Sequence, residues 1–194
     1  MSSQPGPSTA EARRQRLLAL VRERGVKLGE FTLASGRRST YYVDARLVTL
    51  DAEGSWLIAR CVLDLIAREK IEATWIGGLT LGADPIAAAT AALSHVEGRP
   101  INAFLVRKEA KSHGTGRRVE GGLPAEARVV IVDDVITTAG STLQAIDAVE
   151  ALGCKVEAVI CVIDREEGGL EALRGRRFYP LFRISEVLAG TART

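Results

Sequence analysis

The stretch Val129–Thr142 reads VVIVDDVITTAGST, and it decides the fold. Four branched apolar residues run into two adjacent acids, followed by a small, hydroxyl-rich turn and by a segment with helical apolar spacing. An uninterrupted apolar run of this length is typical of a strand buried on both faces. Such a strand, leading directly into a turn and a helix, is the repeating unit of a parallel α/β sheet.

The remainder of the chain continues this alternation. A turn between two β-prone pieces at 31–44 predicts a hairpin or a strand-loop-strand element. The pattern as a whole predicts a mostly parallel sheet with helices on both faces and ligands at the carboxyl ends of its strands. Helices are predicted at 11–24 (ending at Gly25), 57–67, 83–93 and 141–152, and strands at 74–78, 101–106, 128–133 and 156–163.

Length and composition are those of a single globular domain. The chain has 194 residues, of which 46% are hydrophobic and 26% charged. No apolar run approaches the roughly 20 residues needed to span a bilayer, and the polar opening lacks the apolar core of a secretory signal. We therefore predict a disordered tail at 1–10, one domain at 11–194, a cytoplasmic location and no membrane partner. The formal net charge of +2 does not indicate nucleic-acid binding.

The three cysteines, Cys61, Cys154 and Cys161, lie in apolar-periodic segments. An odd number in such positions favours buried reduced thiols over a disulfide framework or a zinc site. His95, Trp56 and Trp75 are interpreted as structural residues because none falls in a candidate site motif.

The acidic turn is a candidate sugar-phosphate site. Backbone N–H groups of Thr137 to Ser141, together with the following helix N-terminus, suit a phosphate. Two unpaired acids beside a phosphate would repel it, so Asp133 and Asp134 suit the hydroxyls of a sugar or a divalent cation. The alternative is that the acids start the turn and that Thr and Ser cap the helix.

A second candidate is the basic segment RKEAKSHGTGRR at 107–118. Arginine and lysine side chains in a loop with flexible glycines suit a diphosphate. A solvated charge run is the alternative, which the neighbouring Glu109 and Glu120 support.

The chain resembles the type I phosphoribosyltransferases, and within them the orotate phosphoribosyltransferases, over about residues 28–188. The resemblance rests on VVIVDDVITTAGST and, in this order around it, on FTLASGRRSTYYVDAR, GGLTLGADPIAAA, FLVRKEAKSHGTGRRVEG and VIDREEGG. It implies the type I phosphoribosyltransferase fold with a small hood, formed mainly by 25–45 and the C-terminal segment. It also implies a Mg²⁺-dependent reaction of orotate with 5-phosphoribosyl 1-diphosphate, and a homodimer in which the basic loop closes over the neighbouring subunit's active site.

The resemblance also assigns roles to particular residues. Lys111 would neutralise charge on the departing diphosphate, with Arg107, Lys108 and His113 assisting, and Asp133 and Asp134 would bind ribose hydroxyls or Mg²⁺ through water. The catalytic set is then Lys111, Asp133 and Asp134. Orotate would contact Thr137, Arg165, Tyr42 and Val43. The sugar diphosphate would contact Arg107, Lys108, Lys111, His113, Thr80, Asp133, Asp134, Val135, Ile136, Thr137, Thr138, Ala139, Gly140 and Ser141.

Several positions depart from the family pattern. Ala34 and Leu81 replace lysines, Gly78 replaces a proline and Val43 replaces an aromatic residue. Ala139 stands where the phosphate turn commonly has glycine, which would be costly if the turn requires a positive φ. Two other functions remain open: a purine phosphoribosyltransferase, and a regulator that senses the sugar diphosphate without turning it over.

Overall fold

The computed structural model describes residues 9–32, 36, 38–109 and 118–189. Of the predicted tail, only Thr9 and Ala10 are described. The Thr9 hydroxyl accepts a hydrogen bond from the Ala12 N–H at 3.1 Å, and this N-cap starts the first helix.

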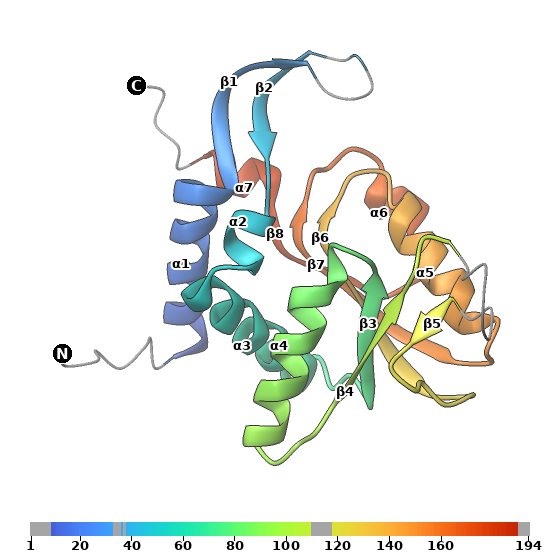
Figure 1. The fold of residues 1–194 in the computed structure, drawn as a ribbon. Helices are drawn as coiled ribbons and strands as arrows, with labels where there is room; N and C mark the ends of the chain where they lie inside the picture. The colour runs from blue at the N-terminus through green and yellow to red at the C-terminus, as the bar shows by residue number, and fades with distance from the viewer. Residues whose placement is uncertain (1–8, 33–35, 37, 110–117, 190–194) are drawn as a thin grey trace.

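A six-stranded sheet forms the centre of the molecule, in the order β5-β4-β3-β6-β7-β8 (Figure 1). All neighbours in it are parallel except the short edge strand β5, which is antiparallel to β4. This arrangement confirms the predicted fold class. The strands are β3 (Trp75–Leu79), β4 (Asn102–Val106), β5 (Val119–Glu120), β6 (Arg128–Ile136), β7 (Lys155–Asp164) and β8 (Phe178–Arg183).

Helices cover both faces of the sheet, as its two-sided apolar strands require. One face carries α3 (Ala52–Arg68) and α4 (Ala83–Val96), with α1 (Ala10–Leu20) packed on α3. The other face carries α5 (Gly140–Glu150). The remaining short helices are α2 (Arg46–Thr49), α6 (Gly169–Ala172) and α7 (Ile184–Leu188).

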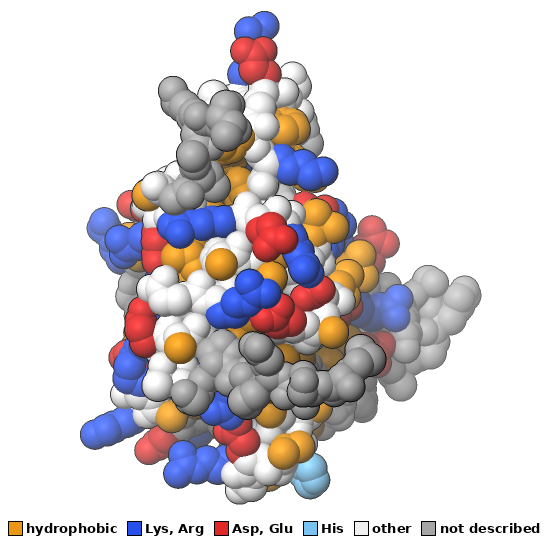
Figure 2. Space-filling model, turned by 90° about the vertical axis from the view of Figure 1, so that its left-hand side faces the viewer, with side chains coloured by type: hydrophobic (Ala, Val, Ile, Leu, Met, Phe, Trp, Pro, Cys, Tyr) orange, Lys and Arg blue, Asp and Glu red, His pale blue; other side chains and the backbone are white. Residues whose placement is uncertain are grey.

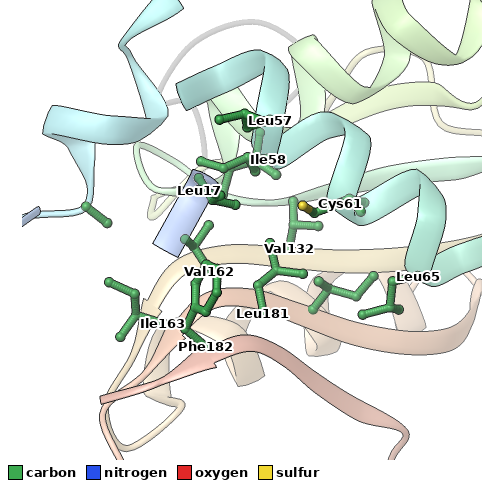
Figure 3. Packing of buried hydrophobic residues seen from close by; sticks show 14 of the residues in the cluster. Leu17, Leu57, Ile58, Cys61, Leu65, Val132, Val162, Ile163, Leu181 and Phe182 are labelled. Carbon is green, nitrogen blue, oxygen red and sulfur yellow. The ribbon is translucent and has the colours of Figure 1, made fainter. Parts of the chain in front are cut away.

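Strand β6 divides its apolar residues between the two resulting cores. Val130 and Val132 belong to the cluster under α1, α3 and α4, whereas Val129 and Ile131 belong to the cluster under α5. Figure 3 shows the first cluster, in which Val132 lies among side chains of α3, β7 and β8. Strict alternation fixes which way each acid after Val132 points, because successive strand residues face opposite sides.

A second, two-stranded sheet forms the hood. Strand β1 (Val26–Thr32) pairs antiparallel with β2 (Arg38–Val43), and the hairpin projects beyond the main sheet (Figure 1). The first strand begins at Val26 rather than Phe31, because the preceding helix ends in a π-helical turn, η1 (Val21–Gly25), at the predicted stop.

Arginine ion pairs connect the N-terminal helix to the C-terminal segment. The Arg14 guanidinium binds the Glu186 carboxylate at 2.7 Å, and the Arg22 side chain donates to the backbone oxygens of Glu186 and Val187. On the face shown in Figure 2, basic and acidic side chains are intermixed, with hydrophobic side chains scattered among them. These contacts place the C-terminal segment beside α1 and η1, the turn that leads into the hood.

Two further findings concern composition. Cys61, Cys154 and Cys161 are buried and free, as predicted. Among the described residues, no helix is both long and apolar enough to cross a membrane.

Candidate active site

The two acids lie inside a strand rather than at its end. The predicted strand stopped at Asp133, but β6 continues to Ile136 because β7 continues to pair with it, up to Ile136 opposite Asp164. Pairing with β3 stops earlier, at Gly77 opposite Ile131. Beyond Ile131, therefore, the other edge of β6 is free of a paired strand, and this is where Asp133 and Asp134 lie.

Asp133 is the buried acid of the pair. Its side chain is on the α5 side of β6, and one carboxylate oxygen, Oδ2, accepts a hydrogen bond from the Thr142 hydroxyl at 3.0 Å. The other oxygen, Oδ1, accepts one from the Asp134 N–H at 3.0 Å. Burial raises the pKa of Asp133 to about 7, and the neighbouring Asp134 carboxylate adds to the effect. The carboxylate is thus desolvated, with few compensating contacts.

Asp134 is half-buried, and its Oδ1 accepts a hydrogen bond from the Val135 N–H at 2.8 Å. The loop after β3 lies directly against both acids. A Cβ atom on Gly82 would be 2.6 Å from Asp134 Oδ1 and 2.7 Å from Asp133 Oδ1. Gly82 therefore permits an approach that any side chain would block. Sequence analysis did not assign this role to Gly82.

A pocket of about 320 Å³ opens between these elements. It brings the acids together with the loop after β3, the segment after β2, Lys108 of the basic segment and Ser141 of α5. Four other residues assigned to the sugar diphosphate from the sequence line this pocket with Asp133 and Asp134, namely Thr80, Lys108, Val135 and Ser141. The lining residues are Val43, Asp44, Ala45, Arg46, Leu79, Thr80, Leu81, Gly82, Lys108, Asp133, Asp134, Val135 and Ser141.

The turn after β6 leads directly into the N-terminus of a helix. Thr137 to Ala139 connect β6 to the eleven-residue helix α5. Ala139 adopts φ 65° and ψ 12°, in the left-handed region, so the conformation that favours glycine is present even though the residue is alanine. Ile136, by contrast, is buried in the core, and only its backbone is available to a ligand.

The basic segment is only partly described. Lys108 reaches the pocket, whereas the Arg107 guanidinium lies 3.7 Å from the Glu120 carboxylate, on the antiparallel β5 strand. The Arg107 N–H also donates to the Arg118 oxygen at 2.8 Å, which closes the base of the loop. Lys111 and His113 lie outside the described residues, as does Ala34.

Arg165 follows β7, next to the turn that follows β6. Its N–H donates to the Ile136 oxygen at 2.8 Å, and its guanidinium binds Glu167 at 2.8 Å and lies 5.3 Å from the centre of the Tyr41 ring. Within the described part of the chain, the buried Nε of Arg165 has no hydrogen-bond partner. Because a buried unpaired N–H is costly, this atom is suited to an acceptor on a ligand.

Strand alternation separates the two hood residues assigned to the base. Val43 lines the pocket, whereas Tyr42 is 41% exposed and its ring packs against that of Phe31 in a tilted contact, with ring centres 5.7 Å apart. Tyr41, two residues from Val43, contacts Arg165 instead. The structure therefore does not bring Tyr42 to the site, because a one-residue offset in a strand turns the side chain to the opposite face.

The acids fit a hydrated magnesium ion better than a caged metal. No cluster of three or more histidine, cysteine or acidic side chains with metal-binding geometry occurs in the described ranges. Mg²⁺ usually retains several waters and uses one or two carboxylates plus substrate phosphates. Asp133 and Asp134 supply two such carboxylates at the pocket wall.

Gly82→Ala should destabilise the folded protein by about 1–3 kcal/mol, because the new methyl group meets two carboxylates whose positions are held by hydrogen bonds. Urea unfolding checks this. Gly140→Ala is the matched control, since a Cβ there meets open space. An equal loss of stability in the two variants would contradict the close approach of Gly82 to the two carboxylates.

Asp133→Asn should stabilise the ligand-free protein at high pH. The folded-state pKa of about 7 lies above the ordinary 3.8, so wild-type stability falls as pH rises between these values, while asparagine does not titrate. The increase in the free energy of unfolding, relative to wild type, should be absent below pH 4 and reach about 1–4 kcal/mol at pH 8. Urea unfolding from pH 4 to 8 measures it, with the exposed Asp147→Asn as control. A pH-independent difference would contradict the burial of a charged group.

Comparison with known proteins matches this geometry to one enzyme family. Residues 77–179 match the model of the phosphoribosyl transferase domain. An orotate phosphoribosyltransferase of Aquifex aeolicus is 43% identical over 180 residues, covering 90% of this chain and 97% of that protein. One of Streptomyces coelicolor is 44% identical over 161 residues, covering 83% and 87%.

Solved structures agree with the sequence comparisons. Mycobacterium tuberculosis orotate phosphoribosyltransferase in complex with Fe(III) dicitrate is 42% identical and has a TM-score of 0.79, covering 90% of this chain and 98% of that one. The same enzyme in complex with 5-phospho-alpha-D-ribosyl 1-diphosphate has a TM-score of 0.76 at 38% identity, with equal coverage. Because relatives more than 40% identical cover about nine-tenths of its length, the chain belongs to the orotate phosphoribosyltransferase family.

Proposed function

We propose that this protein transfers the phosphoribosyl group of 5-phosphoribosyl 1-diphosphate to orotate, in pyrimidine (UMP) biosynthesis. The products are orotidine 5′-phosphate and diphosphate. The observation that carries this proposal is the juxtaposition of Asp133 and Asp134 with the turn at 137–141, at the carboxyl edge of the sheet.

The sugar and its phosphate divide between these two features. The N-terminus of α5 and the backbone N–H groups of the turn would hold the 5′-phosphate, since both present positive dipole ends to an anion. The carboxylates would accept hydrogen bonds from the ribose hydroxyls. Thr142 supports this arrangement from behind, because its hydroxyl holds the buried Asp133 carboxylate in place.

The base would lie toward Arg165. Its guanidinium carries the charge that the orotate carboxylate requires, and its buried Nε has no acceptor among the described residues. Thr137 is close in the chain to this contact, because it follows Ile136, whose oxygen accepts a hydrogen bond from the Arg165 N–H at 2.8 Å. Orotate would thus be recognised between the segments that follow β6 and β7.

The chemistry requires positioning and charge stabilisation, with no covalent nucleophile from the protein. A ring nitrogen of the anionic base forms a bond to the anomeric carbon as the bond to the diphosphate oxygen breaks, and that oxygen retains the electron pair. Lys108, and Lys111 of the loop, would stabilise the charge that develops there. Closure of the loop would exclude water from the sugar centre.

Magnesium would be held by Asp133 and Asp134, through water, together with substrate oxygens. Bound there, the ion would neutralise phosphate charge and orient the leaving group. We also propose a homodimer in which the loop with Lys111 and His113 completes the neighbouring site. The cytoplasmic location stays a prediction from composition.

Orotate should be the base consumed by the purified protein. With 5-phosphoribosyl 1-diphosphate and Mg²⁺ present, the ultraviolet absorbance of orotate should fall, whereas parallel assays with uracil, hypoxanthine and adenine should show no product. Turnover of a purine base would replace this proposal with a purine phosphoribosyltransferase. Binding of the sugar diphosphate without turnover of any base would indicate a sensor.

Lys111→Ala should lower kcat by about 100-fold or more, because removing a group that stabilises transition-state charge typically has an effect of this order. The fold should be retained, which circular dichroism and urea unfolding would verify. Lys70→Ala, in the connection between α3 and β3, is the matched control for loss of one lysine charge. Normal turnover by the Lys111 variant would remove the proposed role.

A further inference from the structure

Acidic side chains outnumber basic ones among the described residues that line the pocket. Three carboxylates line it, from Asp44, Asp133 and Asp134. The loop at 80–82 contributes no charge, and its exposed side chain is that of Leu81, which is 72% accessible. Before a metal ion binds, a diphosphate that enters this pocket therefore meets more negative than positive side chains. Among the described lining residues, the cations are Lys108 and Arg46.

Arg46 is built into the pocket rim by the segment after β2. It is the first residue of α2, and its N–H donates to Asp44 Oδ1 at 3.2 Å. The same carboxylate receives two side-chain hydrogen bonds, from Nε at 2.8 Å and from Nη2 at 3.0 Å. This paired contact fixes the plane of the guanidinium. Because an arginine has five N–H donors in a rigid fork, further donors on Nη1 and Nη2 remain available.

Arg46 lies in the electrostatic field of nearby carboxylates, including that of Asp134. Asp44 raises the pKa of Arg46 through its hydrogen bonds, and the field of Asp134 acts in the same direction. The Arg46 side chain is 54% exposed, so it is accessible to a ligand in the pocket. A planar, pre-oriented guanidinium beside carboxylates that hold a sugar is well suited to the oxygens of a diphosphate on that sugar.

We propose that Arg46 binds the diphosphate of the sugar substrate and of the product, and that Asp44 is its positioning residue. This inference rests on the proposed function, because the diphosphate is the leaving group of that reaction. Arg46 and Lys108 then act together, from the segment after β2 and the segment after β4. Sequence analysis could not assign this role, because Arg46 lies in a short helix with no charge pattern of its own.

The test compares ligands with and without a diphosphate. Arg46→Gln should weaken binding of inorganic diphosphate in the presence of Mg²⁺ by about tenfold or more, measured by isothermal titration calorimetry. This factor is typical of losing one charged hydrogen-bond donor. Affinity for orotidine 5′-phosphate, which has no diphosphate, should stay within twofold. In turnover, KM for the sugar diphosphate should rise while KM for orotate stays unchanged.

Three further variants separate loss of the Arg46 contact from general effects of removing a charge. Arg16→Gln removes an arginine that forms a similar exposed ion pair, to Glu53 at 2.6 Å, but does not line the pocket. This variant should leave the affinity for diphosphate unchanged. Asp44→Asn keeps the Arg46 charge but loses one acceptor, so it should weaken diphosphate binding less than Arg46→Gln does. Arg46→Lys keeps the charge without the fork and should give an intermediate affinity.

Diphosphate affinity in Arg46→Gln equal to wild type would overturn the inference, as would an equal loss of orotidine 5′-phosphate affinity. If that variant does not fold, Arg46→Lys decides, and wild-type diphosphate affinity there would overturn it. The proposed function fails separately, when the wild-type protein binds diphosphate but consumes no orotate. Calorimetry on diphosphate then still tests Arg46 itself.

Discussion

The structure depends on a buried carboxylate that has a like charge as its neighbour. Asp133 is 6% exposed, its pKa is raised to about 7, and Asp134 follows it directly. Burial of a charge beside a like charge opposes folding. The Thr142 hydroxyl and the Asp134 N–H partly offset this cost by donating hydrogen bonds to the Asp133 carboxylate. These hydrogen bonds orient the carboxylate without neutralising its charge. A bound cation or sugar would supply the missing partners.

The elements around the acids are shaped to leave them accessible to a ligand. Strand β3 ends its pairing with β6 at Gly77, so the strand edge beyond Ile131 borders a loop instead of another strand. Gly82 lets that loop approach both carboxylates, and Gly78 lets β3 approach β6, since a Cβ there would be 2.1 Å from the Val132 oxygen. Small residues thus determine the shape of the pocket, whereas charged residues determine which ligands fit it.

The α/β alternation, the parallel sheet and the order of the site motifs followed from local sequence. Apolar periodicity identified β3, β4, β6 and β7, with α3, α4 and α5, and each lies close to its predicted range. The edge strands β5 and β8, with α6 and α7, were not predicted. Their sequences are short or mixed in polarity, so they adopt these conformations because a neighbouring strand or helix stabilises them. The extension of β6 to Ile136 has the same cause, namely pairing with β7.

By itself, the sequence determined which residue types stand at the carboxyl ends of the strands, because buried strands and the turns after them are encoded locally. Only the tertiary structure decided which of these residues meet. It placed Val43 in the pocket and Tyr42 outside it, because strand parity depends on register. It also gave Ala139 a positive φ, and it brought Arg46 into one pocket with Asp134, a residue distant from it in the sequence. Such contacts depend on the packing of whole elements, which no short stretch of residues specifies.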